Sequence, residues 1–111
     1  MNLFTWILVG HLAGDFLVQT KWMADNKAEN WSALLLHCFV YTASVALFAL
    51  PAGGLAWPGI AIIFMGHIII DRRKIVHLWA KYISRSPDIE WLKIAQDQVW
   101  HIIFLALATL F

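Results

Sequence analysis

The chain has 111 residues, enough for one compact domain and too few for two ordinary ones. Of these residues 61% are hydrophobic and 14% are charged, whereas a soluble domain carries about a quarter charged residues. The net charge of +1 argues against a strongly basic, nucleic-acid-binding surface. We therefore expect lipid rather than water as the main solvent of this protein, and no nucleic acid among its partners.

Four apolar segments predict four membrane-spanning helices. Each segment has roughly 17–19 residues and reaches about 26–28 Å as an α-helix, which just spans the hydrocarbon core of a bilayer. Apolar and polar residues do not alternate strictly within these segments, which argues against β-strands. We therefore predict an all-α membrane protein, a four-transmembrane-helix bundle that forms a single transmembrane domain over residues 1–111. The predicted spans cover residues 3–20, 32–50, 55–71 and 94–111.

The three connections between these spans differ in composition. Residues 21–31 are polar and mixed in charge, whereas residues 51–58 contain Gly53 and Gly54 and no charge, which predicts a tight turn. Residues 72–93 are long and basic. Within them apolar side chains recur at helical spacing and basic side chains take the other face. This pattern predicts a basic amphipathic helix at the membrane interface between spans three and four.

The distribution of positive charge predicts how the bundle is oriented. All eight lysine and arginine residues lie in the first and third connections, which share one side of a four-span protein. The positive-inside rule places these connections in the cytoplasm and both termini outside. We therefore predict a multi-pass protein with basic cytoplasmic loops and with membrane lipids as its immediate partners.

Histidine and aspartate residues recur at one spacing within the predicted spans. Three spans contain one of each, four residues apart, which places both side chains on one helix face. The order of the two residues reverses in the fourth span, which runs opposite to the first and third, so that every aspartate lies nearer the cytoplasm. We therefore predict one layer of side chains at a common depth. Its members are His11, Asp15, His37, His67, Asp71, Asp97 and His101.

This layer predicts a metal site. An ionised aspartate at the centre of a membrane helix costs roughly 2.5–3.5 kcal/mol on insertion scales, and the four apolar segments contain no lysine or arginine to neutralise it. Imidazoles and carboxylates suit Zn²⁺, our first choice, and also Mn²⁺ or Fe²⁺; seven ligands are enough for two ions about 3.5–4 Å apart. The alternative is that each histidine hydrogen-bonds to its own aspartate and the pairs hold the helices together.

A few polar neighbours are candidates for supporting roles. Gln19 continues the stripe of the first span, and Gln98 adjoins the aspartate of the fourth, so that each can orient a ligand from outside. Lys74 and Lys27 can lie at the cytoplasmic edge of the same layer and bind a phosphate there. The alternative for Lys74 is an interface anchor whose charge reaches water while its stem stays in lipid.

The polar blocks, in this order and spacing, resemble a family of small bacterial and phage polytopic membrane proteins that is known only as a domain of unknown function. The resemblance covers nearly the whole chain and implies a protein of the bacterial inner membrane. Asn26 falls within the same signature, and with Lys27 and Lys74 it completes the predicted substrate-binding residues. A looser similarity, in motif style and size, is to membrane-bound metal-dependent hydrolases. The blocks are His11-Leu-Ala-Gly-Asp15-Phe-Leu-Val-Gln19, Asn26-Lys27, His37, His67-Ile-Ile-Ile-Asp71-Arg-Arg-Lys74 and Asp97-Gln98-Val-Trp-His101.

Four functional hypotheses follow. The first is an intramembrane hydrolase that uses one or two metal ions to cleave a phosphoester or related bond of a lipid-type substrate at the cytoplasmic leaflet. The second is a transporter or ion-binding protein that binds a divalent cation or relays protons, although few polar residues continue toward the outer side. The third is haem binding through paired histidines. The fourth is a structural membrane protein without chemistry. Each is compatible with a homo-oligomer.

Overall fold

The structure is a computed structural model that describes residues 2–27, 29–72, 74–86 and 88–111, without the side chain of Lys74. All the regular structure of these residues is helical, so the predicted all-α class is confirmed. The elements in chain order are α1 (Leu3–Leu12), the π-helix η1 (Ala13–Leu17), α2 (Lys21–Asn26), α3 (Trp31–Ala49), the short 3-10 helix η2 (Leu50–Ala52), α4 (Trp57–Asp71), α5 (Lys74–Tyr82) and α6 (Glu90–Ala108).

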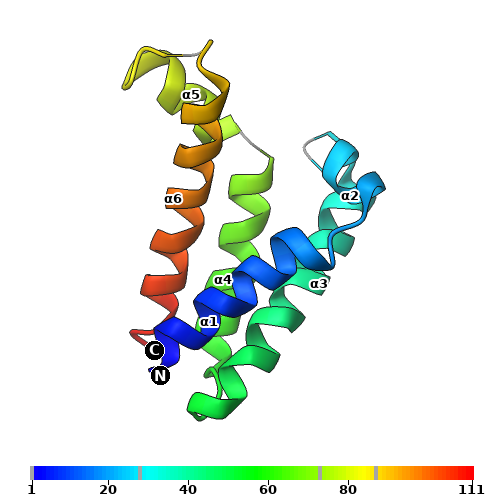
Figure 1. The fold of residues 1–111 in the computed structure, drawn as a ribbon, viewed down its shortest axis with the longest axis vertical. Coiled ribbons are helices and arrows are strands. Elements are labelled where there is room, and N and C mark those ends of the chain that lie inside the picture. The colour runs from blue at the N-terminus through cyan, green and yellow to red at the C-terminus, as the bar shows by residue number, and fades with distance from the viewer. Residues whose placement is uncertain (1, 28, 73, 87) are drawn as a thin grey trace.

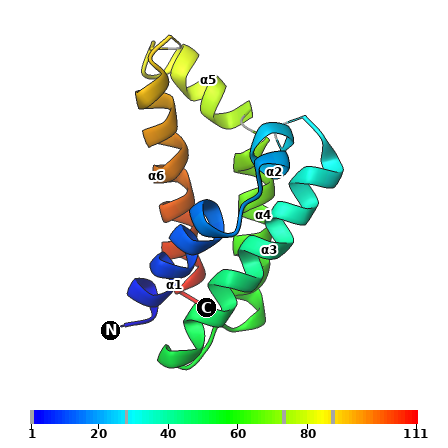
Figure 2. The same cartoon turned by 45° about the vertical axis from the view of Figure 1, so that its right-hand side comes forward.

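Four long helical segments form the body of the molecule: α1 with η1, α3, α4 and α6 (Figure 1). α1 packs mainly against α3, and α4 packs against both α6 and α3. The two termini and η2 lie at one end of this body, whereas the short helices α2 and α5 lie at the other (Figure 2). Consecutive long segments therefore run in opposite directions.

Helix length and composition identify one membrane-spanning candidate among the described helices. The continuous helix over Trp31–Ala52 has 22 residues and is apolar enough to cross a bilayer. The apolar helices Leu3–Leu17 and Trp57–Asp71 are shorter, and at 1.5 Å per residue each reaches only about 22 Å. The first predicted span thus ends three residues early, at Leu17 rather than at 20. By these criteria the structure supports one span and not the predicted four.

Helix ends fall where the sequence offers suitable side chains or glycines. Asn2, Thr20 and Asn30 cap α1, α2 and α3, since each side chain accepts a hydrogen bond from a backbone N–H of the first turn. The predicted tight turn lies between η2 and α4, where Gly53 and Gly54 have φ angles of 103° and 85°. Such angles are strained for any residue with a Cβ atom.

The interior of the body divides into an apolar part and a polar part. The apolar core lies between α1, α3, α4 and α6, toward the end that holds the termini. Toward α2 and α5 the same helices bury histidine and aspartate side chains instead. The apolar core contains Ile7, Tyr41, Val45, Ala49, Ile63, Leu105 and Ala108.

The contact between α1 and α3 is close enough to require glycine. A Cβ atom at Gly10 would lie 2.9 Å from the Cα atom of Val45, and one at Gly14 would lie 2.8 Å from the ring of Tyr41. These glycines stand on either side of His11 along the chain. A larger residue at either position would therefore push the helix that carries His11 away from α3.

Gly10→Val should lower the free energy of unfolding by about 1–3 kcal/mol, because the added methyl groups meet the backbone of α3 and not a movable side chain. Ala61→Val is the matched control on the exposed face of α4, and it should change stability by less than about 0.5 kcal/mol. Denaturant unfolding of the purified protein, followed by circular dichroism, measures both. Equal stability of the two variants would contradict the close packing.

Candidate metal centre

The four long segments bring the predicted histidines and aspartates together in the polar part of the interior. Six of them are buried, with 4% or less of their surface exposed. The side chain of Asp97 is 16% exposed and marks the edge of the layer. The side chains predicted to share one depth therefore do lie together. The buried six are His11, Asp15, His37, His67, Asp71 and His101.

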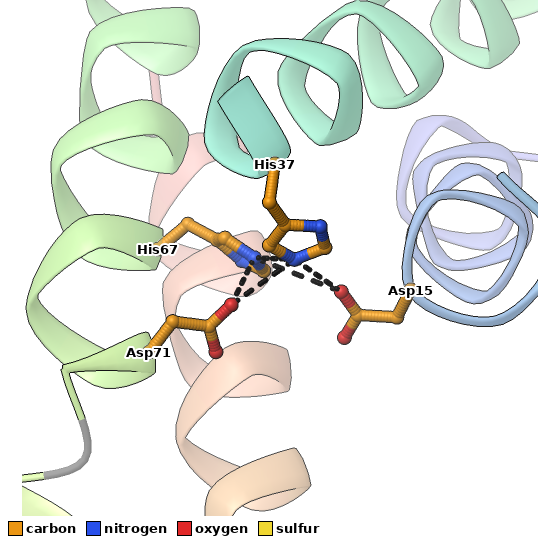
Figure 3. Close-up of side chains that lie close together, drawn as sticks. All are labelled: Asp15, His37, His67 and Asp71. Carbon is orange, nitrogen blue, oxygen red and sulfur yellow. Dashed lines mark hydrogen bonds and ion pairs between the residues drawn. The ribbon is translucent and has the colours of Figure 1, made fainter. Parts of the chain in front are cut away.

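The first ligand group contains Asp15, His37, His67 and Asp71, and one ligand atom from each lies within 4.8 Å of the others. Asp71 Oδ2 lies 2.8 Å from His67 Nε2 and 3.0 Å from His37 Nε2. Asp15 Oδ1 lies 3.3 Å from the same nitrogen of His37. Figure 3 shows the two imidazoles and two carboxylates pointing toward one another from η1, α3 and α4.

Acceptor atoms outnumber hydrogens within this first group. The Nε2 atoms of His37 and His67 are 2.8 Å apart, and one hydrogen at most can lie between them. Asp15 Oδ1 and Asp71 Oδ2 are buried beside these imidazoles, and the ammonium of Lys27 lies 3.3 Å from Asp71 Oδ2. Because two buried carboxylates are costly unless their charge is balanced, a further cation among these four atoms would stabilise them. The donor set therefore fits a metal ion.

The second ligand group contains Asp71, Asp97 and His101. His101 Nδ1 lies 2.7 Å from the backbone carbonyl oxygen of Asp97, which only accepts, so Nδ1 carries a hydrogen and donates it. The other ring nitrogen, Nε2, lies 3.2 Å from Asp71 Oδ1. In a neutral His101 this nitrogen presents a lone pair to a carboxylate oxygen. A proton or a metal ion between the two atoms removes that repulsion.

Asp71 belongs to both groups and divides its two oxygens between them. Oδ2 faces His37 and His67, whereas Oδ1 faces His101. If a metal ion bound in each group, Asp71 would be the ligand that bridges the two groups. Pairs of metal ions that share a ligand supply an activated water and charge stabilisation in hydrolytic centres.

A π-helical turn positions Asp15. The wider turn of η1 rotates this residue away from the regular α-helical register with His11, so that Oδ1 reaches His37 while Oδ2 lies 3.8 Å from His11 Nδ1. Gln19 donates a hydrogen bond of 2.9 Å to the backbone carbonyl of Asp15 and so holds this turn from its C-terminal side. Short π-helical segments occur frequently at functional sites.

His11 lies in the layer but outside both ligand groups. Its Nδ1 atom lies 2.7 Å from the hydroxyl of Tyr41, and its Nε2 atom lies 2.9 Å from Oε1 of Gln98. Gln98 thus contacts the layer, as its sequence position suggested. The sequence interpretation missed Tyr41, although it follows His37 by four residues and so shares its face of α3.

The predicted substrate-binding residues take different positions. Lys27 borders the first group, since its ammonium nitrogen lies 3.3 Å from Asp71 Oδ2 and its side chain is 18% exposed. Asn26 instead donates a hydrogen bond of 2.9 Å to the backbone carbonyl of Trp22, along its own helix. The side chain of Lys74 lies outside the described part of the chain.

Comparison with protein families places the chain among relatives. A family model described as "Protein of unknown function (DUF3307)" matches residues 3–111. The chain belongs to this family. The resemblance to a domain of unknown function is thereby confirmed, and no curated protein or solved structure matches the chain. The family description assigns no activity.

The two ligand groups of this DUF3307 protein differ in the number of ligands that they offer a metal ion. Both can hold a metal ion that prefers nitrogen and oxygen ligands, as Zn²⁺, Mn²⁺ and Fe²⁺ do. The first group offers two nitrogens and two oxygens, and the second offers one nitrogen and two oxygens. The first group could therefore supply four ligands to a metal ion and the second three.

Asp71→Asn should remove more bound metal than any other single change, because both groups lose an oxygen ligand at once. We expect about two equivalents of zinc in the wild type and about one in Asp97→Asn, which affects the second group alone. Asp25→Asn, at an exposed carboxylate of α2, is the control and should keep the wild-type content. Elemental analysis after purification without chelators and reloading with Zn²⁺ measures this. Full metal content in Asp71→Asn would contradict the bridging arrangement.

Proposed function

We propose that this protein is an intramembrane hydrolase with two metal ions, which cleaves a phosphoester or related bond of a lipid-type substrate at the cytoplasmic leaflet. The observation that carries the proposal is that the two oxygens of Asp71 face two separate ligand groups. When bound, a metal pair of this kind supplies an activated water and stabilises the charge that develops on the phosphoryl oxygens. The residues of the chain would hold the metal ions and bind the substrate.

The outer surface of the body supports its placement in a membrane. Large apolar side chains are exposed on every long segment, a surface that would aggregate in water but suits lipid. α3 is long enough to span alone, and the shorter α1–η1 and α4 can span where the bilayer thins or the chain ends reach the interface. We therefore propose four spans in a single transmembrane domain over 1–111. The exposed apolar residues include Leu12, Leu17, Phe39, Leu47, Trp57, Met65, Val99 and Ile103.

The end of the body that holds α2 and α5 faces the cytoplasm in this proposal. Every lysine and arginine among the described residues lies in the segments at this end, and the described residues at the end with the termini include none. α5 exposes apolar side chains suited to the lipid interface. The ligand groups then lie just below the cytoplasmic surface of the inner membrane. The exposed apolar residues are Leu78, Trp79 and Tyr82 of α5 and Ile83, which follows it.

Substrate approaches the ligand groups from this cytoplasmic end. Lys27 lies there with its ammonium beside Asp71, and a phosphate oxygen offers that ammonium a charged hydrogen bond. Asp97, whose side chain is 16% exposed, would be the most exposed ligand of the second group and marks where the layer is nearest to solvent.

Transport and haem binding have less support from the same geometry. Beyond the layer the helices enclose an apolar core, and the cavity beside His67 and His101 measures about 10 Å³, room for one water. An ion path would need polar groups continuing across the membrane. A haem between paired histidines would need space for its ring, yet the facing nitrogens of His37 and His67 are 2.8 Å apart.

The proposed orientation predicts which residues a membrane-impermeant thiol reagent can reach. In a Cys38→Ser background, which removes the single buried native thiol, Ala56→Cys should react in intact cells because it lies between η2 and α4, on the outer side. Ala24→Cys, on α2, should react only after the membrane is permeabilised. Both alanines are exposed, so the pair is matched. The reverse pattern would contradict the orientation.

Hydrolysis of phosphomonoesters and phosphodiesters, offered free and on lipids in mixed micelles, tests the activity. At saturating metal concentration, we expect His101→Gln to abolish turnover. We expect Lys27→Gln to raise KM by about tenfold or more, because a charged hydrogen bond to the substrate is lost. Lys21→Gln, which breaks only an exposed ion pair with Asp25, should leave both constants unchanged. A metal-loaded wild type that cleaves none of these substrates would sink the proposal.

A further inference from the structure

His11 stands at the centre of a hydrogen-bonded chain that joins three helices. Tyr41 on α3 and Gln98 on α6 contact its two ring nitrogens, at 2.7 Å and 2.9 Å. Gln98 extends the chain, because its amide nitrogen donates to Oδ2 of Asp97 over 3.5 Å. The chain therefore ends on a residue of the second ligand group.

The direction of these hydrogen bonds follows from Asp97. Its ionised carboxylate only accepts, so the amide nitrogen of Gln98 faces it and the amide oxygen faces His11. His11 Nε2 must therefore carry a hydrogen and donate it. A neutral His11 has its lone pair at Nδ1, where the hydroxyl of Tyr41 donates to it; a protonated His11 has no lone pair. In neither state does His11 keep a lone pair for a metal ion.

Tyr41 also contacts a ligand of the first group directly. Its ring stacks on the imidazole of His67, with ring centroids 3.8 Å apart and ring planes inclined by 17°. His67 Nδ1 is buried and makes no hydrogen bond to any described residue. The hydrogen bond that usually orients a metal-bound histidine is therefore replaced here by a ring face. Tyr41 is itself 2% exposed and tied to His11.

We infer that His11 and Tyr41 are positioning residues of the metal centre and that His11 is not a ligand. Tyr41 holds the ring of His67 in the first group, and His11 orients Asp97 in the second through Gln98. The inference rests on the proposed metal centre and deepens it. It reduces the predicted ligand histidines from four to three and adds a tyrosine that the sequence motifs do not contain.

Cadmium NMR separates ligands from positioning residues in the whole protein. In protein labelled with ¹⁵N-histidine and loaded with ¹¹³Cd²⁺, each ligating nitrogen shows a scalar coupling to the metal. We expect this coupling at Nε2 of His37, His67 and His101 and at neither nitrogen of His11. A coupling at His11 would overturn the inference.

Two substitutions of Tyr41 separate its ring from its hydroxyl. Tyr41→Leu removes both and should weaken ¹¹³Cd²⁺ binding by about 10–100-fold, as changes beside metal ligands do. Tyr41→Phe keeps the ring on His67 and should restore most of this affinity and the ¹¹³Cd chemical shift of the first group. His77→Gln, at an exposed histidine of α5, is the control. A wild-type affinity and chemical shift in Tyr41→Leu would contradict the positioning role.

A measurement on metal-free protein distinguishes failure of this inference from failure of the metal centre. ¹⁵N chemical shifts should place a hydrogen on Nε2 of His11, and Gln98→Leu should abolish that preference because the acceptor is gone. If the wild type binds no cadmium, the proposed function fails. A hydrogen fixed on Nε2 of His11 would still support the hydrogen bonds that join Tyr41, His11, Gln98 and Asp97. A hydrogen on Nδ1, with none on Nε2, would overturn the inference.

Discussion

The need to neutralise one buried carboxylate governs this structure. Asp71 is 2% exposed, and three imidazole nitrogens and the ammonium of Lys27 lie within 3.3 Å of its oxygens. In an interior of low dielectric constant, an unpaired carboxylate costs several kcal/mol. The positive charge must come from a lysine, from protons on the histidines or from metal ions. The imidazoles can serve in two ways, because they carry positive charge when protonated and bind metal ions when neutral.

The helices can converge on this carboxylate only because their backbones approach closely. Gly10 and Gly14 let α1 lie against α3, and Gly66 lets α4 lie against the ring of Phe104 on α6. The wider π-helical turn of η1 then places the side chain of Asp15 beside His37. Beyond the layer the same helices pack an apolar core. The core therefore fixes the distances between helices, and these distances in turn fix the ligand geometry.

Most of the ligand layer was predictable from the sequence, because a histidine and an aspartate four residues apart share a face in any α-helix and the reversed order in the fourth span indicates a common depth. The π-helical turn that rotates Asp15 away from this register was not predictable from this spacing. Contacts between distant segments were not predictable in this way. The bond between His11 and Tyr41 joins residues 30 apart and depends on how two helices pack. Helix lengths were predicted less well, because hydropathy does not show that α1–η1 ends at Leu17.

In the proposed hydrolase, Lys27 would couple metal binding to substrate binding. Its ammonium lies 3.3 Å from Asp71 Oδ2, the oxygen that also faces His37 and His67. A metal ion and Lys27 therefore compete for the same acceptor. Under the proposed function, a metal ion that neutralised the carboxylate would free the ammonium to pair with an anionic substrate, and that anion would hold Lys27 away from the metal. Each ligand would then strengthen the binding of the other, as reciprocal coupling between two sites requires.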